Sequence, residues 1–515
     1  MTTIEVGSGP LSPEDVVEVA RHAATVELTA EARDAIKTSR AWIDQLAASD
    51  TPVYGVSTGF GALASRHIAP ELRTQLQRSL IRSHAAGSGE LVEPEVVRAL
   101  MLLRLSTLAT GRTGVRIETA EAYAAMLNSG LVPVVHEFGS LGCSGDLAPL
   151  AHCALAVMGE GDVIDGGVRR PAAGALADHG IAPVVLAEKE GLALINGTDG
   201  MLGMLVLALH DLRLLLDTAD LAAAMSVEGL LGTDRVFAAD LQALRPQPGQ
   251  AVSAARLTRL LAGSGIVASH RHGDGQVQDA YSLRCAPQVH GGARDTLEHA
   301  ARVAGHELAS AIDNPSVLPD GRLESHGNFH GAPLAYVLDF LAIPVADVAS
   351  MSERRTDRFL DASRSRGLPP FLAHDAGVDS GLMIAQYTQA ALVAELKRLA
   401  VPASVDSIPS SAMQEDHVSL GWSGARKLRR AVDALTRVIA IEIMTAARGI
   451  DLRGPLQPSP ATAGAIAVLR RQVDGPGPDR FLAPDIEATT RLVRSGELLA
   501  AAHHALLEPL ERNHP

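Results

Sequence analysis

Cysteine is scarce in this chain, and basic residues are fewer than acidic ones. The 515 residues include three cysteines, Cys143, Cys153 and Cys285, and so small an odd number excludes a disulfide framework. This usage is typical of a reducing compartment, and we expect a cytoplasmic protein. The 45 basic and 59 acidic residues give a net charge of −14, so the field of the protein repels phosphate backbones and anionic membranes. We therefore expect neither a nucleic acid nor a membrane as its partner.

Long uncharged hydrophobic runs and secretory features are also missing. No such run reaches the roughly 20 residues that a membrane-spanning helix needs, and the stretch 204–216 is interrupted by His210, Asp211 and Arg213. Residues 1–6 carry an acid and no basic segment, so they do not resemble a secretory signal. We expect a soluble protein from these two absences.

Aliphatic residues are abundant, and their spacing is helical. Hydrophobic residues make up 47% of the chain and aromatic ones only 3%, so the core consists mainly of Leu, Val, Ile and Ala, which pack well in helices. Apolar residues recur at threes and fours over 202–231, 385–399 and 427–447, and we predict a long helix in each range, the last ending at Arg448-Gly449. The short apolar runs 163–164 and 182–186 are candidate strands.

Glycine-punctuated segments gather in the first part of the chain, at 54–63, 87–89 and 139–145. This contrast predicts a mainly α fold with two domains. Residues 1–200 would form a smaller, loop-rich N-terminal domain, and residues 201–515 a long central helical bundle with C-terminal helices. The Pro- and Gly-rich stretch 454–464 is predicted to be a loop before the last helices.

Generic motifs indicate other chemistries only weakly. Gly55-Val56-Ser57-Thr58-Gly59 fits the nucleophile elbow of serine hydrolases. That elbow requires a strand before it and an alternating strand and helix pattern around it, whereas this chain is mostly helical, so a hydrolase acting through Ser57 is a remote alternative. The pairs His136-Glu137 and His306-Glu307 lack the second histidine of a zinc protease, and we expect no metal site.

The most informative segment runs from Gly139 to His152. It begins with the string Gly139-Ser140-Leu141-Gly142-Cys143-Ser144-Gly145-Asp146, and an apolar run follows. Glycines and a Ser-Gly-Asp sequence before an apolar run predict a tight loop that leads into a helix, with Asp146 near the N-cap. On the residues alone, a capped helix is the simplest interpretation of this segment.

The same string resembles the signature of the histidine and aromatic amino acid ammonia-lyases, and the resemblance extends over nearly the whole chain. In that family an internal Ala-Ser-Gly tripeptide cyclises to 4-methylidene-imidazole-5-one, so no external cofactor is needed. The resemblance places Cys143, Ser144 and Gly145 in these roles. Glycine leaves its nitrogen unhindered for attack on the first residue's carbonyl carbon, and the serine hydroxyl can leave as water. Cys143 replaces the usual alanine but contributes only its carbonyl carbon, so we expect the ring to form.

Further motifs follow in the order and spacing of the family. They are Val53–Gly61, Ser83–Gly87, Leu194–Thr198, Gln278–Arg284, Gly327–His330 and Gln414–His417. Each residue by itself has an ordinary structural explanation, such as a half-buried tyrosine or a core histidine, but their joint order makes coincidence remote. Asp199 and Asp379 are departures, because many members have an uncharged residue at the first position and we expect asparagine at the second.

The resemblance implies a role for each matching residue. Tyr54 is the general base, and Asp146 assists the cyclisation. The residues expected to bind the substrate are His84, Asn196, Gln278, Tyr281, Arg284, Phe329 and Glu415. Among these, Arg284 would pair with the substrate carboxylate, while His84 and Glu415 would select the side chain. A phenol with an ordinary pKa of roughly 10 is mostly neutral at pH 7, so either the site lowers the pKa of Tyr54 or the optimum is alkaline.

The activity implied by the resemblance is the non-oxidative deamination of L-histidine to trans-urocanate and ammonia. The resemblance also implies the aspartase/fumarase-like superfamily and a homotetramer in which each active site draws residues from more than one subunit. A tyrosine or phenylalanine ammonia-lyase, or an aminomutase, would keep the electrophile and change the pocket. A helical assembly protein without chemistry, like the hydrolase, would lack the electrophile.

Overall fold

The chain folds into two compact, mainly helical units. The computed structural model describes residues 2–49, 52–59, 61–63, 65–272 and 274–507, with 59% helix and 7% strand. The predicted mainly α fold is therefore confirmed. The first unit comprises Met1–Ala208, Ala300–Asp339 and Pro402–Arg426, and the second comprises Leu209–His299, Phe340–Val401 and Lys427–Pro515. The expected division at residue 200 differs from this arrangement, because two later segments of the chain return to the first unit.

Short helices and small sheets make up the first unit. Its helices are α1 (Pro13–Arg21), α2 (Ala30–Ala47), α3 (Arg73–His84), α4 (Pro94–Ala109), α5 (Ile117–Asn128), α6 (Leu147–Val157), α7 (Ala172–Asp178) and α8 (Glu190–Ile195). Its strands are β1 (Thr3–Val6), β2 (Thr25–Leu28), β3 (Ser88–Leu91), β4 (Val132–Pro133), β5 (His136–Phe138), β6 (Asp162–Asp165), β7 (Val168–Pro171), β8 (Ser316–Val317) and β9 (Leu323–Glu324). The strands pair as β1-β2, β3-β5, β4-β6-β7 and β8-β9, and only β1-β2 is parallel.

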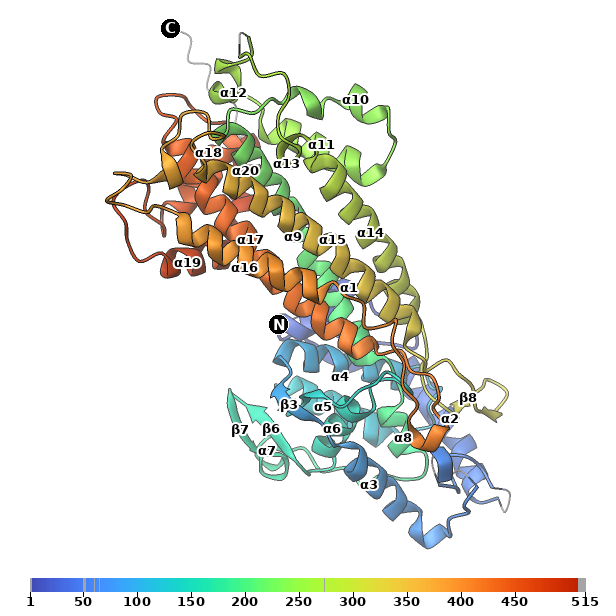
Figure 1. Cartoon of the computed structure of the whole chain (residues 1–515). Helices are drawn as coiled ribbons and strands as arrows, with labels where there is room; N and C mark the ends of the chain where they lie inside the picture. The colour runs from blue at the N-terminus through green and yellow to red at the C-terminus, as the bar shows by residue number, and fades with distance from the viewer. Residues whose placement is uncertain (1, 50–51, 60, 64, 273, 508–515) are drawn as a thin grey trace. The chain divides into compact units, whose positions relative to one another are not determined.

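Helix α4 lies at the centre of the first unit. Every residue from Val96 to Ala109 in it is buried, as expected for a helix that is covered on all sides. Helices α3, α6 and α8 pack against one another, and α6 also packs against α4 (Figure 1). This arrangement brings the end of α3, the start of α6 and the end of α8 into one region, although the chain separates them widely.

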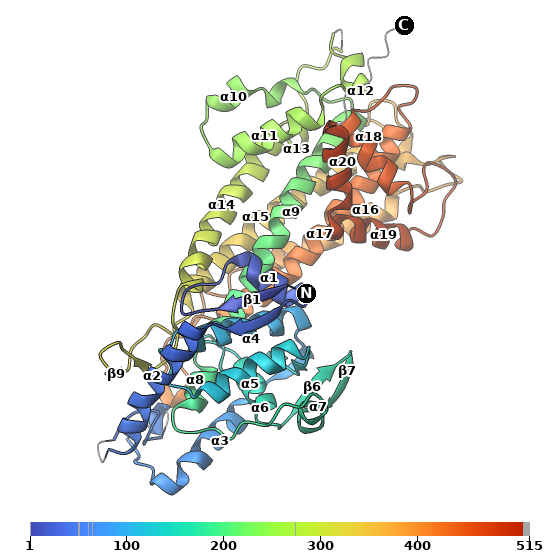
Figure 2. The same ribbon diagram turned by 180° about the vertical axis from the view of Figure 1, so that it is seen from behind.

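Long helices dominate the second unit. They are α9 (Asp199–Gly229), α14 (Ala286–Leu308), α15 (Ala332–Leu360), α16 (Met383–Leu399) and α17 (Gly421–Asp451), of which α9, α14, α15 and α17 also have one end in the first unit. The shorter helices are α10 (Ala239–Ala243), α11 (Pro248–Leu260), α12 (Gly265–Ser269), α13 (Tyr281–Arg284), α18 (Pro460–Leu469), α19 (Ala483–Ser495) and α20 (Glu497–Leu507). The long helices run side by side, as both views show (Figures 1 and 2).

Buried polar contacts join these long helices. Arg355 of α15 pairs with Glu442 of α17 at 2.5 Å, and Ser226 of α9 donates to the same carboxylate at 2.7 Å. Both charged side chains are fully buried. Because a buried charge is costly without a partner, this contact favours one register of the three helices over others.

The predicted long helices are present, with one wrong end. Ranges 202–231 and 385–399 correspond to α9 and α16 and are confirmed. The predicted stop at Arg448-Gly449 is wrong, because α17 continues to Asp451. A Cβ at Gly449 would lie 2.5 Å from the ring of Phe359, so this glycine allows a close side-chain contact and does not end the helix.

One of the two candidate strands exists. Residues 163–164 lie in β6, which confirms that prediction. Residues 182–186 form no strand, so the second prediction is wrong; Val184 donates to Val157, while Val185 is 72% exposed. An apolar run without a neighbouring strand has no ladder to join. Helices α14 and α15 were not predicted; α14 contains glycines and α15 contains Pro344, residues that weaken a helical pattern.

Helix α15 is long and apolar enough, by length and composition, to cross a membrane. Within the described part of the chain, no other helix passes this test. However, 61% of its apolar window is buried inside the protein, a property that the core helices of folded bundles share.

Candidate active site

The Cys143-Ser144-Gly145 segment forms a tight loop directly before α6. Gly142 and Gly145 have φ angles of +68° and +82°, a region that favours glycine. Gly145 forms an isolated parallel bridge with Gly197, and a Cβ at position 145 would overlap the Gly197 carbonyl. The loop is therefore built around a glycine at the third position of the tripeptide, which is the residue type that cyclisation needs.

Asp146 is the N-cap residue of α6, but its side chain does not cap that helix. The carboxylate accepts hydrogen bonds from the Met201 backbone at 2.8 Å and from the Ser140 hydroxyl at 2.9 Å. The predicted position of Asp146 at the N-cap is confirmed, but these partners occupy its carboxylate, which therefore makes no capping hydrogen bond to α6. Burial raises the pKa of Asp146 to about 7, so the group can take up or release a proton near neutral pH.

A cavity of about 240 Å³ opens beside this loop. Its lining includes His84 at the end of α3, Cys143, and Glu415 from a segment that returns late in the chain. Gly139, Leu147 and Ala148 complete the wall next to the Cys143-Ser144-Gly145 loop, with Ala86, Leu141, Ser410 and Ser411. The fold thus places the two predicted selectivity residues at one cavity with the first residue of the tripeptide.

His84 and Glu415 both offer acceptors to this cavity. Nδ1 of His84 donates to the Leu80 carbonyl at 2.9 Å, which leaves Nε2 as the acceptor of the neutral ring. Burial lowers the pKa of His84 and favours this neutral form. Ser410 donates its hydroxyl to the Glu415 carboxylate at 2.8 Å and thereby orients it. The pair suits a substrate ring that carries N–H groups.

The Cys143 side chain contributes to the same cavity. Cys143 is 8% exposed, and the pKa of its thiol is raised to about 12 by burial and by the nearby Glu415 carboxylate, to which it is hydrogen-bonded. A thiol with so high a pKa stays protonated and is a poor nucleophile. Cys143, at a position where the family usually has alanine, therefore contributes an uncharged side chain to the wall of the cavity.

Tyr54 lies in a turn over residues 54–57. Its hydroxyl accepts a hydrogen bond from the Gly61 backbone at 3.3 Å. Burial raises the pKa of Tyr54, and the Glu415 and Asp313 carboxylates raise it further, although the Gly61 contact acts in the opposite direction. With Tyr54 as the predicted base, these surroundings favour an alkaline pH optimum of the activity over a lowered pKa of Tyr54.

Asn196 follows α8 and is held by buried groups that the sequence analysis missed. Its side-chain amide donates to the Asn314 backbone carbonyl at 2.8 Å, and its backbone carbonyl accepts from Arg104 at 2.8 Å. Arg104 is fully buried and pairs with Asp199 at 2.5 Å. Asp199, at a position where many family members have an uncharged residue, thus neutralises the buried Arg104. The two residues are far apart in the sequence, so this ion pair is seen only in the fold.

Phe329 is half-buried in a turn over residues 328–329 of the first unit. The next residue, His330, stacks on His417 with ring centroids 5.3 Å apart, and Nε2 of His330 lies 3.2 Å from Nδ1 of His417. This contact joins the segment of Phe329 to the segment of Glu415. The two predicted motifs therefore meet at this pair of histidines.

Gln278, Tyr281 and Arg284 belong to the second unit. The guanidinium carbon of Arg284 lies 4.7 Å from the centre of the Tyr281 ring, and Tyr281 is 70% exposed. Gln278 is exposed as well. In the single chain, none of the three lines the cavity beside Cys143.

Asp379 has a structural role in the second unit. Its carboxylate accepts from the backbones of Asp479 at 2.8 Å and Asp375 at 3.0 Å, and Asp479 in turn accepts from Ser380 and Gly381. These backbone donors lower the pKa of Asp379. The residue thus ties two loops together through exchanged hydrogen bonds.

The hydrolase alternative does not fit the structure. Ser57 is fully buried, and its hydroxyl accepts from the Val53 backbone at 2.9 Å. The described residues around it form a turn and one isolated bridge from Thr58 to His67, whereas an elbow needs a strand before the serine and a helix after it. Ser57 therefore supports the loop of Tyr54.

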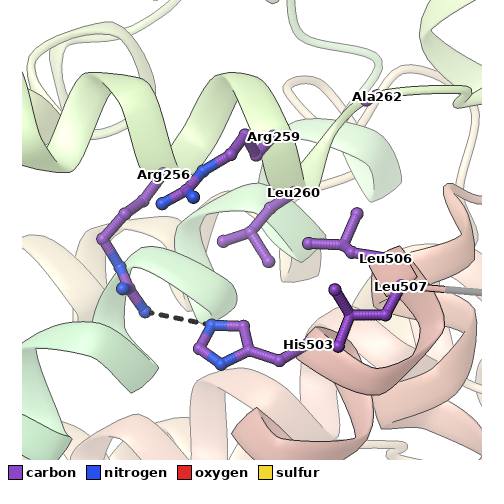
Figure 3. A pocket seen from close by; sticks show the side chains of 7 residues that line it. All are labelled: Arg256, Arg259, Leu260, Ala262, His503, Leu506 and Leu507. Atoms are coloured by element: carbon purple, nitrogen blue, oxygen red, sulfur yellow. Dashed lines mark hydrogen bonds between the residues drawn. The ribbon is translucent and has the colours of Figure 1, made fainter.

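A larger cavity, of about 580 Å³, lies in the second unit. Arg256, His503 and apolar side chains of α11 and α20 line it, and Arg256 faces His503 across it (Figure 3). Arg256 is already paired with Asp217 at 3.2 Å. None of the predicted site residues lines this cavity. The candidate site is therefore identified by the chemistry of its residues and not by the volume of its cavity.

Comparison with known proteins identifies the family of the chain. The family model described as aromatic amino acid lyase matches residues 11–471. The chain belongs to the aromatic amino acid lyase family. The enzyme is accordingly an ammonia-lyase, which cleaves a carbon–nitrogen bond.

Close relatives match over almost the whole chain. Histidine ammonia-lyase of Streptomyces griseus is 66% identical over 506 residues, which cover 97% of this chain and 98% of the relative. The crystal structure of histidine ammonia-lyase from Trypanosoma cruzi has a TM-score of 0.90 at 39% identity and covers 99% of this chain and 96% of its own. Tyrosine aminomutase from Streptomyces globisporus has a TM-score of 0.92 at 37% identity, with 99% and 100% covered. The fumarase-like helical fold predicted from the sequence is thereby confirmed.

We expect Tyr54→Phe to lower kcat by roughly 10²- to 10⁴-fold, because phenylalanine keeps the ring and loses the proton acceptor. The KM should change little. Because burial raises the pKa of Tyr54, the fraction of enzyme with a deprotonated Tyr54 keeps increasing through the alkaline range. Wild-type kcat/KM should therefore still increase above neutral pH, and the variant should lose that rise. Steady-state kinetics across the alkaline range measure both effects.

Tyr123→Phe is the matched control. Tyr123 is fully buried in α5, and its hydroxyl has no hydrogen-bond partner among the described residues, so the variant should keep normal turnover. If Tyr54→Phe instead showed normal kcat with a raised KM, Tyr54 would be a binding residue and not the base.

Proposed function

We propose that this ammonia-lyase deaminates L-histidine to trans-urocanate and ammonia. The observation that carries this proposal is the cavity at which His84 and Glu415 face the Cys143-Ser144-Gly145 loop. The imidazole ring of histidine carries one N–H when neutral and two when protonated, and the cavity supplies acceptors for these donors once water is removed. The names of the close relatives support the same substrate.

The loop residues fit a 4-methylidene-imidazole-5-one, for which no external cofactor is required. Gly145 has a positive φ and no room for a side chain, and Ser144 supplies a hydroxyl that can leave as water. Asp146, with a pKa of about 7, stands next to the tripeptide and is suited to proton transfer during cyclisation. The group, once formed, supplies an electrophile that converts the substrate amine into a better leaving group.

The other residues then bind the substrate and move its proton. His84 and Glu415 hold the imidazole ring and thereby fix the side chain beside the loop. Tyr54 takes the proton from the β-carbon. The positive end of α6, which begins directly after Asp146, favours negative charge that develops at the loop.

We propose a cytoplasmic homotetramer in which other copies help to complete each site. Arg284 is suited to pair with the substrate carboxylate, and Tyr281 next to it is 70% exposed in the single chain. Large apolar side chains on α15 are exposed as well, at Tyr336, Phe340 and Ile343, which share one helix face. Exposed apolar faces of this kind are typical of subunit interfaces.

The direct test is to incubate the purified protein with L-histidine and to follow urocanate by its absorbance, with ammonia measured in parallel. Glu415→Gln should lower kcat/KM for L-histidine by about 10- to 100-fold, because it keeps the shape and removes the charge from a hydrogen bond to the ring. The protein should remain folded, since the amide oxygen can still accept from Ser410.

Glu95→Gln provides the control for this variant. Glu95 pairs with Arg21 at 2.7 Å and does not line the cavity, so the loss of its charge should leave kcat/KM unchanged. Equal amounts of urocanate and ammonia are expected from the wild type. Absence of urocanate from an active, cyclised enzyme would contradict the proposal.

A further inference from the structure

The backbone next to His84 makes one side-chain contact that the reaction does not use. Gly87 lies three residues after His84, and its N–H donates to Nε2 of His152 at 3.0 Å. His152 is on α6, one helical turn after Ala148, which lines the cavity. A Cβ at Gly87 would lie 3.0 Å from that nitrogen and 3.3 Å from the Phe138 carbonyl oxygen. The glycine, the histidine and β5 therefore meet at a point that has no room for another side chain.

The hydrogen bond defines the protonation of His152. Because Nε2 accepts a hydrogen bond, the proton of the neutral ring must be on Nδ1. Burial and, to a smaller extent, the neighbouring His136 ring, whose centroid lies 5.7 Å away, lower the pKa of His152 to about 4. His136 itself donates through Nδ1 to the Gly89 carbonyl at 2.9 Å. His152 is thus a neutral acceptor above about pH 4.

The contact lies between the segment Ser83–Gly87, which carries His84, and helix α6, which follows the Cys143-Ser144-Gly145 loop. The segment after α3 has local hydrogen bonds from Ala85 to Ile81 and from Ala86 to His84, and neither one ties it to α6. The Gly87 contact with His152 provides that tie. Helix α6 starts at Leu147, directly after the loop of Cys143, so its position and that of the electrophile are coupled.

We propose that His152 is a positioning residue for substrate selection, which holds the segment of His84 at a set distance from the electrophile loop. The inference rests on the proposed function, because it assigns His84 to the imidazole of the substrate. His152 does not line the cavity and acts only through the Gly87 backbone. Loss of the acceptor would leave a backbone donor without its partner and let the segment shift.

Two variants of similar length separate the acceptor from the packing. His152→Gln can place an amide oxygen near the position of Nε2, whereas His152→Met fills the same space and cannot accept the bond well. We expect His152→Met to raise the KM for L-histidine by about 5- to 150-fold, with a smaller effect on kcat. His152→Gln should stay close to the wild type. Intact mass should show the same loss of two waters in both variants.

A double-mutant cycle with His84→Ala tests the route of the effect. In that background His152→Met should add little, since it acts through a side chain that is already gone. The inference would be overturned if His152→Met raised the KM equally with and without His84. It would also be overturned if the methionine variant had the KM of the wild type, or if its intact mass showed that the electrophile had not formed. A wild type that rejects L-histidine would instead overturn the proposed function, and the same variants would then be compared with the amino acid that it accepts.

Discussion

Ser144→Ala is expected to abolish turnover and to leave a folded protein. Without the hydroxyl no water can be lost from the middle residue, so the methylidene does not form and the substrate amine remains a poor leaving group. We expect kcat to fall by about 10³-fold or more, as it does when a covalent catalytic group is removed. Ser144 is half-exposed, so removal of one oxygen should change the free energy of unfolding by only about 0.5 kcal/mol.

Intact mass and turnover should be measured on the same sample. The wild type should be lighter than its sequence mass by two waters, and Ser144→Ala should not be. Cys143→Ala is the matched control one residue away: its carbonyl carbon is unchanged, so the ring should form and substantial activity should remain. Ordinary turnover in Ser144→Ala, or a wild type without the mass loss, would refute the internal electrophile.

A strong preference for L-histidine over L-phenylalanine is the second large effect. In the cavity, Nε2 of His84 and the Glu415 carboxylate are both acceptors, because Nδ1 of His84 is occupied by Leu80. Phenylalanine would offer a hydrogen-bond donor to neither of them after water is displaced. A site that hydrogen-bonds its substrate can reject an analogue without those groups by about 10⁴- to 10⁵-fold in kcat/KM, and we expect a ratio of this order.

Tyrosine should be rejected less strongly, because its hydroxyl can donate to one of the two acceptors. Measurement of kcat/KM for the three amino acids decides the assignment. His84→Leu should narrow the ratio between histidine and phenylalanine, since it replaces one acceptor by an apolar wall. Equal or higher kcat/KM for tyrosine or phenylalanine would refute L-histidine as the substrate and leave the family assignment unchanged. A β-amino acid product would identify an aminomutase.

The long helices and the order of the motifs were accessible from the sequence. Apolar spacing is a local property, and it predicted α9 and α16 because long amphipathic helices carry their pattern in consecutive residues. The same local rules failed where a residue serves a distant contact. Gly449 continues α17 because the ring of Phe359 lies against it, and a local rule treats it as a stop.

The resemblance selected the site residues, but the fold decided their surroundings. Position in the chain places Asp146 at an N-cap, yet its carboxylate faces Met201 and Ser140 and has its pKa raised to about 7 by burial. The sequence left two possibilities for the pKa of Tyr54, and burial together with Glu415 favours the higher value. Such shifts depend on solvent exclusion and on nearby charges, which only the packed chain creates.

By itself the sequence determined the helical class, the tripeptide and the residue types of the site. The tertiary structure alone decided that His84, Cys143 and Glu415 line one cavity, and that the acidic departure at Asp199 neutralises a buried Arg104. The physical reason is the range of the interactions. Helix periodicity and glycine conformations arise between residues close in the chain, whereas the cavity and the buried ion pair depend on how α3, α4, α6 and the returning segment 402–426 pack together.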